Sequence, residues 1–141
     1  MQPNLKSKSL EQLEKNIWPS LSSDETSYLI KICHNLRKKP LIDFSVEDTR
    51  IMIGQNMGLE HLIPMVIDFL KTTILAEGDY YEGDLLTSVL SSDSEYWKTH
   101  STEHKVVITL FETNQTILQN CDATWKIKKQ WTTLFRDFQN L

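Results

Sequence analysis

Apolar residues recur at helical spacing along most of this chain of 141 residues. The clearest run begins at Leu59 and continues at positions i+3, i+4, i+7, i+8 and i+11, as far as Leu70. This spacing places the apolar side chains on one face of a helix, which we expect to end near Thr72 or Thr73. Pro64 lies within the run, where it is compatible with the first turn of a helix or with a bend. The residues that this pattern predicts to be buried are Leu62, Ile63, Val66 and Ile67.

A second helix is predicted directly upstream. Pro40 interrupts any helix that arrives from the N-terminal side, because proline has no N–H to donate. Ser45 can accept hydrogen bonds from the first free amides of a new helix. Glu47 and Asp48 follow in its first turn, where the helix dipole favours negative charge. Gly58 is predicted to stop this helix. The two helices, joined at Gly58, predict a hairpin at the centre of the core.

Two shorter helices are predicted on the N-terminal side of the hairpin. Ser9 can cap the first of them, and Pro19 ends it. Ser22 or Ser23 can cap the second. The apolar stripe of this second helix consists of Tyr28, Leu29, Ile32, Cys33 and Leu36. Trp18 is predicted to pack at the rim of the core, with an exposed anchor for a partner as the alternative, since tryptophan is enriched at interface hot spots.

The C-terminal half of the chain also reads as helical. Asp84 and Asp122 are predicted to cap helices, because aspartate side chains accept hydrogen bonds from free amides at helix starts. The predicted helices cover residues 85–90, a short stretch around 96–97, residues 101–119 and a last segment from 123 onwards. Residues 106–111 also have the β-propensity of a strand, but the chain offers no second strand with which it could pair.

We therefore predict an all-α fold of about six to eight helices. A chain of this length is expected to form a single domain over residues 1–141, with residues 1–8 frayed. Hydrophobic residues make up 40% of the chain and charged residues 24%, which suits a helix-rich globular protein.

Composition also restricts the cellular environment. No stretch approaches the roughly 20 apolar residues that span a bilayer, and the first residues lack the apolar core of a signal peptide. We therefore expect a cytoplasmic protein without a membrane partner. The two cysteines, Cys33 and Cys121, are too few for a disulfide framework. Cys33 is expected to be a small residue of the core.

Acidic charge is concentrated in the middle third of the chain. The net charge is −4, and residues 51–100 carry two lysines against eight carboxylates. Half of these carboxylates lie within residues 77–84, together with two tyrosines and two glycines. Glycines beside charges predict a turn or loop. A surface of this sign repels nucleic acid and attracts a basic partner.

Two histidines and the same carboxylates also suit other kinds of site. His100 and His104 would lie on one face of a helix, as a zinc site requires, but a third ligand with its own signature is missing. We therefore interpret them as surface histidines. The carboxylates of residues 77–84 suit an acid–base pair or a calcium site, although their spacing does not match an EF-hand. We rank a partner-binding surface or solvated loop first, a metal site second and catalysis last. The sequence predicts no catalytic residue, no metal site and no cofactor.

Several ordered segments in the central part of the chain carry a resemblance to a known family. These segments are 36–41 (LRKKPL), 44–48 (FSVED), 50–56 (RIMIGQN), 58–59 (GL), 62–64 (LIP) and 75–86 (LAEGDYYEGDLL). Together they resemble contact-dependent growth inhibition (CDI) immunity proteins. The resemblance covers roughly residues 10–90 and becomes thin after Trp97.

This resemblance implies a binding protein that neutralises the C-terminal toxin domain of a CDI system. Toxins of this kind are delivered by a neighbouring bacterium and are often nucleases, commonly acting on tRNA. A ribonuclease must present basic side chains to phosphate, and carboxylates interleaved with tyrosines can occupy such a surface. The candidate toxin-binding residues are Glu77, Asp79, Tyr80, Tyr81, Glu82 and Asp84.

The partner expected from this hypothesis is the cognate toxin domain, which we expect to be a basic protein and an RNase. We expect a monomer that forms a 1:1 heterodimer with the toxin, does not bind nucleic acid directly and is not an enzyme. One alternative is a small helical metal-dependent or hydrolytic enzyme that uses residues 77–84 with His100 and His104. Another alternative is a structural adaptor without a toxin partner. The turn at residues 18–25 is the next candidate for a binding surface.

Overall fold

The computed structural model describes residues 6–19 and 27–141, and all regular elements in these ranges are helical. The predicted all-α fold is confirmed. The elements are α2 (Leu10–Glu14), α3 (Tyr28–Leu36), the 3₁₀ helix η1 (Leu41–Asp43), α4 (Val46–Gly54), α5 (Leu59–Thr72), α6 (Asp84–Leu90), α7 (Ser94–Thr99), α8 (Ser101–Thr113), α9 (Gln115–Asn120) and α10 (Trp125–Gln139). The described residues thus contain nine α-helices, slightly more than the six to eight predicted.

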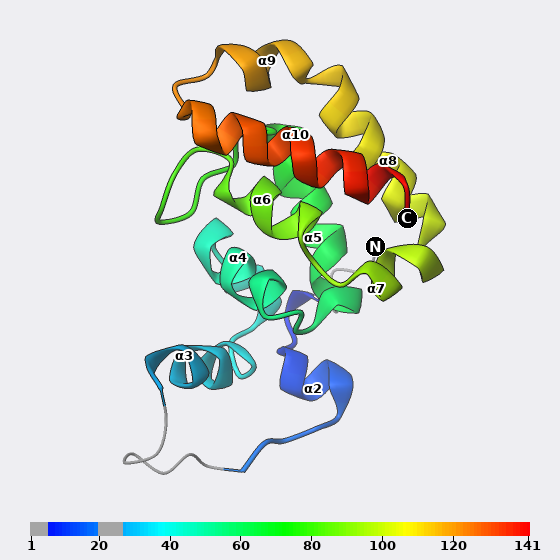
Figure 1. Ribbon diagram of the computed structural model, residues 1–141. Coiled ribbons are helices and arrows are strands. Elements are labelled where there is room, and N and C mark those ends of the chain that lie inside the picture. Colours follow the sequence, from blue (N-terminus) through cyan, green and yellow to red (C-terminus); the bar gives the residue numbers. More distant parts are fainter. Residues whose placement is uncertain (1–5, 20–26) are drawn as a thin grey trace.

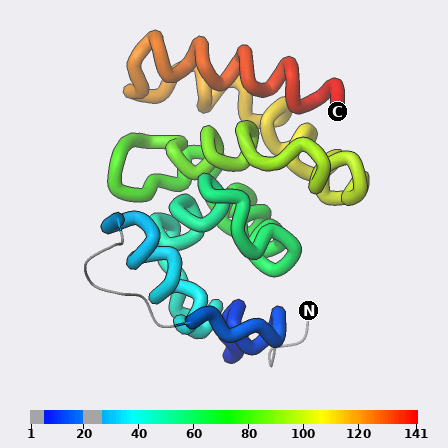
Figure 2. The backbone as a smooth tube through the Cα atoms, turned by 60° about the horizontal axis from the view of Figure 1, so that its bottom comes forward, coloured from blue at the N-terminus to red at the C-terminus, as the bar shows by residue number. Residues whose placement is uncertain are grey.

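The helices are arranged in tiers, as Figure 1 shows. Helices α2 and α3 form the bottom tier, α4, α5 and α6 the middle tier, and α8, α9 and α10 the top. The tube view of Figure 2, turned by 60°, shows the same order. Helix α4 packs against both α5 and α6, and α6 in turn packs against α10. Helix α6 therefore connects the middle of the molecule with its C-terminal helix.

The hairpin predicted at the centre of the core is present. Ser45 caps α4 in a capping box with Asp48, as its position in the sequence indicated. The role of Gly58 differs from the prediction. Helix α4 already ends at Gly54, and Gly58 begins α5 with a left-handed φ of 64°. A Cβ at Gly58 would come within 2.7 Å of Leu10, so both the backbone angle and the packing require glycine.

The buried face of α5 follows the predicted periodicity. Leu62, Ile63 and Val66 are fully buried, and Ile67 is nearly so. Helix α5 ends at Thr72, where the pattern was expected to fade, and accommodates Pro64 in its interior. Cys33 is buried in the same core, as predicted. Among the residues described, no helix combines the length and the apolar character that crossing a membrane requires.

Helix starts and stops near the N-terminus match the prediction in part. Ser9 caps α2 in a capping box with Gln12. The helix already ends at Glu14, and its C-cap, Lys15, adopts a left-handed conformation, so Pro19 is not what stops it. The predicted caps at Ser22 and Ser23 and most of the 18–25 turn lie outside the described residues. Within the described range, Ser27 caps α3.

The C-terminal helices correct two boundaries and confirm the helix predicted over residues 106–111. The predicted helix 101–119 is interrupted at Asn114, which separates α8 from α9. Helix α10 is capped by Thr124 and not by Asp122, since the hydroxyl of Thr124 accepts from the amide of Ile127 at 3.3 Å. Residues 106–111, for which a strand was the alternative, belong to α8.

Trp18 is half-buried beside α3, where its ring centre lies 6.2 Å from that of His34. The guanidinium carbon of Arg37 lies 4.2 Å from the centre of the Trp18 ring. Arg37 itself is buried and forms an ion pair with Glu14. The side chain of Arg37 therefore points into the protein and links α3 to α2.

Candidate functional site

The candidate site predicted at residues 77–84 is a loop that leads from α5 to α6. We call residues 77–83 the acidic loop. In Figure 1 it projects at the left edge of the molecule, between α4 and the N-terminal end of α10. Its chain is held to the protein at its C-terminal end, where the amide of Gly83 donates to the carbonyl of Leu75 at 3.2 Å. The loop therefore closes on itself at its base.

Asp84 has a different role from the other carboxylates of this segment. It is the first residue of α6 and not its cap, because Gly83 occupies the cap position. Its side chain is only 3% exposed. One carboxylate oxygen accepts from the amide of Gly78 at 2.7 Å and the other from the amide of Tyr80 at 3.1 Å. Asp84 therefore holds the loop from inside, and its charge does not face a partner.

A second carboxylate reaches the loop from α4. Glu47 accepts two hydrogen bonds from the guanidinium of Arg50, at 2.6 and 2.7 Å, and a third from the amide of Asp79 at 3.0 Å. The hydrogen bond from Arg50 is the main reason why the pKa of Glu47 lies below its ordinary value. The Nε atom of Arg50 also lies 3.7 Å from Asp84. A guanidinium thus sits between two carboxylates that together bind three loop amides.

The other side of the loop is fixed through the hydroxyl of Thr87 in α6. This oxygen accepts from the hydroxyl of Tyr81 at 3.0 Å and from the indole N–H of Trp131 at 2.9 Å. It donates to the carbonyl of Gly83 at 3.3 Å. One hydroxyl therefore uses its full hydrogen-bonding capacity to join the loop, α6 and α10.

Gly83 is required at this junction. Its φ of 82° lies in the left-handed region, and a Cβ would overlap the ring of Trp131. Trp131 is almost fully buried. The acidic loop is therefore packed directly against the last helix of the chain.

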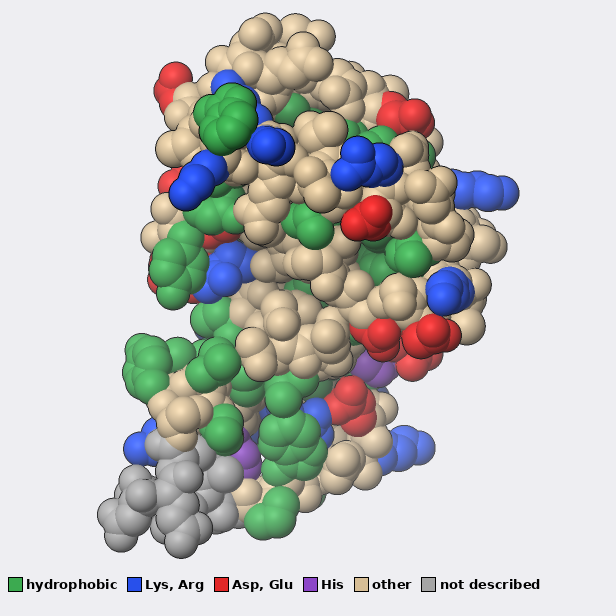
Figure 3. Space-filling view, in the orientation of Figure 1, with side chains coloured by type: hydrophobic (Ala, Val, Ile, Leu, Met, Phe, Trp, Pro, Cys, Tyr) green, Lys and Arg blue, Asp and Glu red, His purple; other side chains and the backbone are tan. Residues whose placement is uncertain are grey.

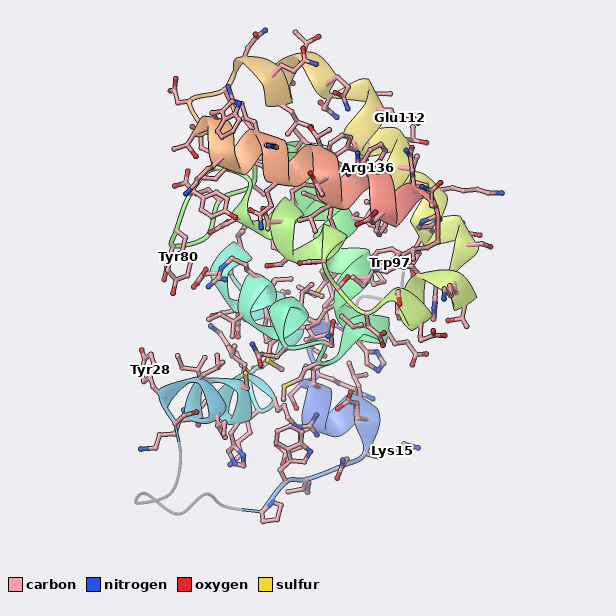
Figure 4. All side chains as sticks on the ribbon, viewed as in Figure 1. Lys15, Tyr28, Tyr80, Trp97, Glu112 and Arg136 are labelled. Atoms are coloured by element: carbon pink, nitrogen blue, oxygen red, sulfur yellow. The ribbon has the colours of Figure 1, made fainter. Side chains whose placement is uncertain are left out.

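The remaining candidate residues lie at the surface. Glu77 and Asp79 are exposed, and Tyr81 and Glu82 are half-buried. Tyr80 is 73% exposed and points away from the protein at its left edge (Figure 4). Its ring is nevertheless held in position by Arg50, because the guanidinium carbon of Arg50 lies 4.6 Å from the ring centre. The structure thus brings five of the six predicted residues to the surface of one fixed loop.

Sequence reasoning did not find the residues that hold this loop. Glu47 and Arg50 have the i, i+3 spacing of a helical ion pair, but nothing in that spacing points to residue 79. Thr87 and Trp131 are separated by 44 positions and carry no shared motif. These residues meet only because α4 and α10 both pack against α6.

His100 and His104, the two histidines considered for a zinc site, differ in burial. His104 is buried, and its Nε2 lies 2.7 Å from the carbonyl oxygen of Phe138 in α10. The ring of His100 stacks on Tyr96 with 3.8 Å between the ring centres. The surface interpretation is therefore wrong for His104, because α10 covers that face of α8. Within residues 6–19 and 27–141, no three His, Cys, Asp or Glu side chains are grouped to hold a metal ion.

A hollow on another face of the molecule is lined mainly by apolar side chains. Its volume is about 330 Å³, and it lies along α5. The described residues around it include Leu13, Leu41, Pro64 and Met65. The acidic loop contributes none of these lining residues, so the carboxylates and this hollow do not form a common site.

A comparison with protein families decides what kind of protein presents this loop. A family model for CDI immunity proteins matches residues 12–107, well over half of the chain. The chain belongs to this family. The function of this immunity protein is therefore protection against a CDI toxin, which implies a cognate toxin as its partner. The match includes the acidic loop and ends within α8, so α9 and α10 lie outside it. No curated protein and no solved structure matches the chain.

Proposed function

We propose that this immunity protein neutralises a nuclease toxin by placing the acidic loop against the basic surface with which the toxin binds RNA. The observation that carries the proposal is the loop itself. Glu77, Asp79 and Tyr80 are exposed on a segment whose backbone amides are bound by Asp84 of α6 and Glu47 of α4. Family membership supports the general role, and the chemistry of the loop supports the class of toxin.

The proposed mechanism requires no chemical step by the immunity protein. A nuclease holds the phosphates of its substrate with lysine and arginine side chains, and exposed carboxylates compete for the same groups. Tyrosines add rigid apolar area with a polar tip, which is typical of the residues that dominate binding energy. The immunity protein then blocks access of the RNA, with tRNA as the proposed substrate, in a 1:1 complex in the cytoplasm.

The fixed loop gives this mechanism a physical advantage. A mobile segment would lose conformational freedom on binding, and that loss would oppose association. Asp84, Glu47 and Thr87 already hold the loop in one conformation in the free protein. The surface carboxylates are therefore placed before the toxin arrives.

The test is to remove the loop charges without changing the shape of the loop. Asp84 stays unchanged, because it is an internal residue. The partner is the basic C-terminal domain of the exoprotein that we expect to be encoded directly upstream. The variant combines Glu77→Gln, Asp79→Asn and Glu82→Gln. Its association with the toxin domain should be roughly ten-fold or more slower than that of the wild type at low salt, and the difference should shrink as salt rises.

A matched control carries the same change of total charge at exposed acids elsewhere on the surface. It should associate within about two-fold of the wild-type rate, because charges distant from an interface contribute weakly to steering. The control combines Asp68→Asn, Glu95→Gln and Glu112→Gln. Equal rates and equal salt dependence for the loop variant and the wild type would exclude the loop as the toxin-facing surface. A toxin domain that binds the protein but degrades no RNA would exclude a ribonuclease as the toxin.

A further inference from the structure

A second exposed aromatic side chain lies outside the region matched by the family. Trp125 is the first residue of α10, and it is 72% exposed. The ammonium nitrogen of Lys129, one helical turn further on, lies 5.0 Å from the centre of its ring. The Thr124 cap begins the helix directly before it. A large indole is therefore displayed in a fixed position on a rigid element.

This helix start is adjacent to the acidic loop. In Figures 1 and 2 the N-terminal end of α10 lies next to the loop in both views. Trp131, six residues further along α10, packs on Gly83 at the base of the loop. Six residues of α-helix correspond to about 9 Å along the axis. The start of α10, which carries Trp125, and the acidic loop, which carries Tyr80, thus form two parts of one edge of the molecule. The contact between Trp131 and Gly83 joins these two parts.

The two parts of this edge carry opposite charge. Glu77 and Asp79 are exposed on the loop. Lys126 and Lys129 are exposed beside Trp125, and Figure 3 shows lysine and arginine side chains gathered over α10. A partner that covers both parts needs a basic region opposite the loop and an acidic or polar region, with a place for an indole, opposite α10. Such a pair of opposite charges permits only one orientation of the partner.

We propose that the N-terminal turn of α10 is the second half of the toxin-binding surface and selects which toxin is bound. This inference rests on the proposed function. The acidic loop suits any basic nuclease, so charge attraction at the loop alone discriminates poorly between toxins. Trp125, Lys126 and Lys129 add a requirement for shape and for opposite charge on the toxin. They lie on a helix beyond the region that the family model describes.

The first experiment replaces the exposed indole. Trp125→Ala should accelerate dissociation of the upstream-encoded toxin domain by about ten-fold or more and change association little, because an aromatic anchor acts after encounter. The control is Ile42→Ala, which removes another exposed apolar side chain, 66% accessible, from η1. It should leave dissociation unchanged. Both variants should keep the wild-type circular dichroism spectrum, since neither residue is buried.

The second experiment reverses charge. Lys126→Glu with Lys129→Glu should weaken binding by roughly ten-fold or more, because like charges would then meet across the contact. Lys98→Glu with Lys105→Glu is the matched control. These lysines are exposed on α7 and α8, which lie away from the start of α10 in Figures 1 and 2. The control should bind within about two-fold of wild type.

The outcomes separate the two proposals. If the wild-type protein does not bind the toxin domain, the proposed function fails. If the loop variant binds weakly while the Trp125 and Lys126/Lys129 variants bind like wild type, the proposed function is supported and the start of α10 is not part of the toxin-binding surface. If only the α10 variants lose binding, the start of α10 belongs to the toxin-binding surface and the acidic loop does not.

Discussion

The carboxylate of Asp84 accepts hydrogen bonds from two loop amides in a position that is almost closed to solvent. Removing it would leave the amides of Gly78 and Tyr80 without their acceptor and Arg50 with one carboxylate fewer. We predict that Asp84→Ala lowers the free energy of unfolding by about 2–3 kcal/mol, as expected for hydrogen bonds to a charged group. Chemical denaturation measures the difference.

Asp79→Ala is the control for this prediction. Asp79 carries the same charge five positions upstream, but its side chain is exposed and only its backbone amide holds the loop. Its replacement should change stability by less than about 0.5 kcal/mol, as surface substitutions do. Equal losses in the two variants would show that Asp84 does not anchor the loop.

The identity of the anchoring residue could not be inferred from the segment itself. All four carboxylates between residues 77 and 84 have similar neighbours in sequence. Asp84 differs because it follows the left-handed Gly83 and starts α6, which turns its side chain back beneath the loop. A position at a helix start is a local property, and the sequence indicated it. The burial of that position depends on α4 and α10, and no local pattern reports it.

At the scale of elements, α6 connects the acidic loop with α10 through the hydroxyl of Thr87. Thr87→Val keeps the shape of the side chain but leaves the indole N–H of Trp131 and the hydroxyl of Tyr81 without their acceptor. We predict a loss of about 1–2 kcal/mol in stability, the usual consequence of unpaired partly buried donors. Amide hydrogen exchange in the loop should also become faster, because one of its attachments is lost.

The matched change is Thr132→Val. Thr132 is exposed on α10, and its hydroxyl donates to the carbonyl of Lys128 in its own helix. This variant should keep its stability within about 0.5 kcal/mol of wild type. Unchanged loop exchange in Thr87→Val would mean that Asp84 and Glu47 hold the loop without Thr87.

Boundaries of elements show where local signals were sufficient. Ser9 and Ser45 start helices as predicted, because a side-chain acceptor at a cap acts within its own turn. Asp122 does not start α10, since Thr124 two residues later takes the cap position. Gly58 was placed at the correct junction, but its role was assigned to the wrong helix. Such choices between nearby candidates depend on how the helices pack.

At the scale of the whole molecule, α5 forms the centre of the packing. Ile63 is fully buried there, and its loss would leave a cavity that the surrounding helices cannot fill. We predict that Ile63→Ala reduces stability by roughly 2–5 kcal/mol, measured by chemical denaturation. Ile42→Ala is the same substitution at an exposed position and should cost less than about 0.5 kcal/mol. Similar losses of stability in the two variants would show that α5 is not the centre of the packing.

The tiers of helices also decide which parts of the surface are neighbours. The acidic loop belongs to the region matched by the family, and the start of α10 follows more than 40 positions later. They form one edge because α6 packs against both α4 and α10. An acidic part and a basic part of the surface are thereby placed side by side, although they are separate in the sequence.

By itself the sequence determined the helical class, the central hairpin with its buried residues, and the position of the acidic loop. These features depend on periodicity, caps and glycines, which act over one or two helical turns. Only the tertiary structure decided which carboxylate is buried, which tyrosine is displayed, and which helix lies beside the loop. Glu47, Thr87 and Trp131 hold the loop through contacts that span up to 44 positions, and such contacts arise from packing, which no local pattern encodes.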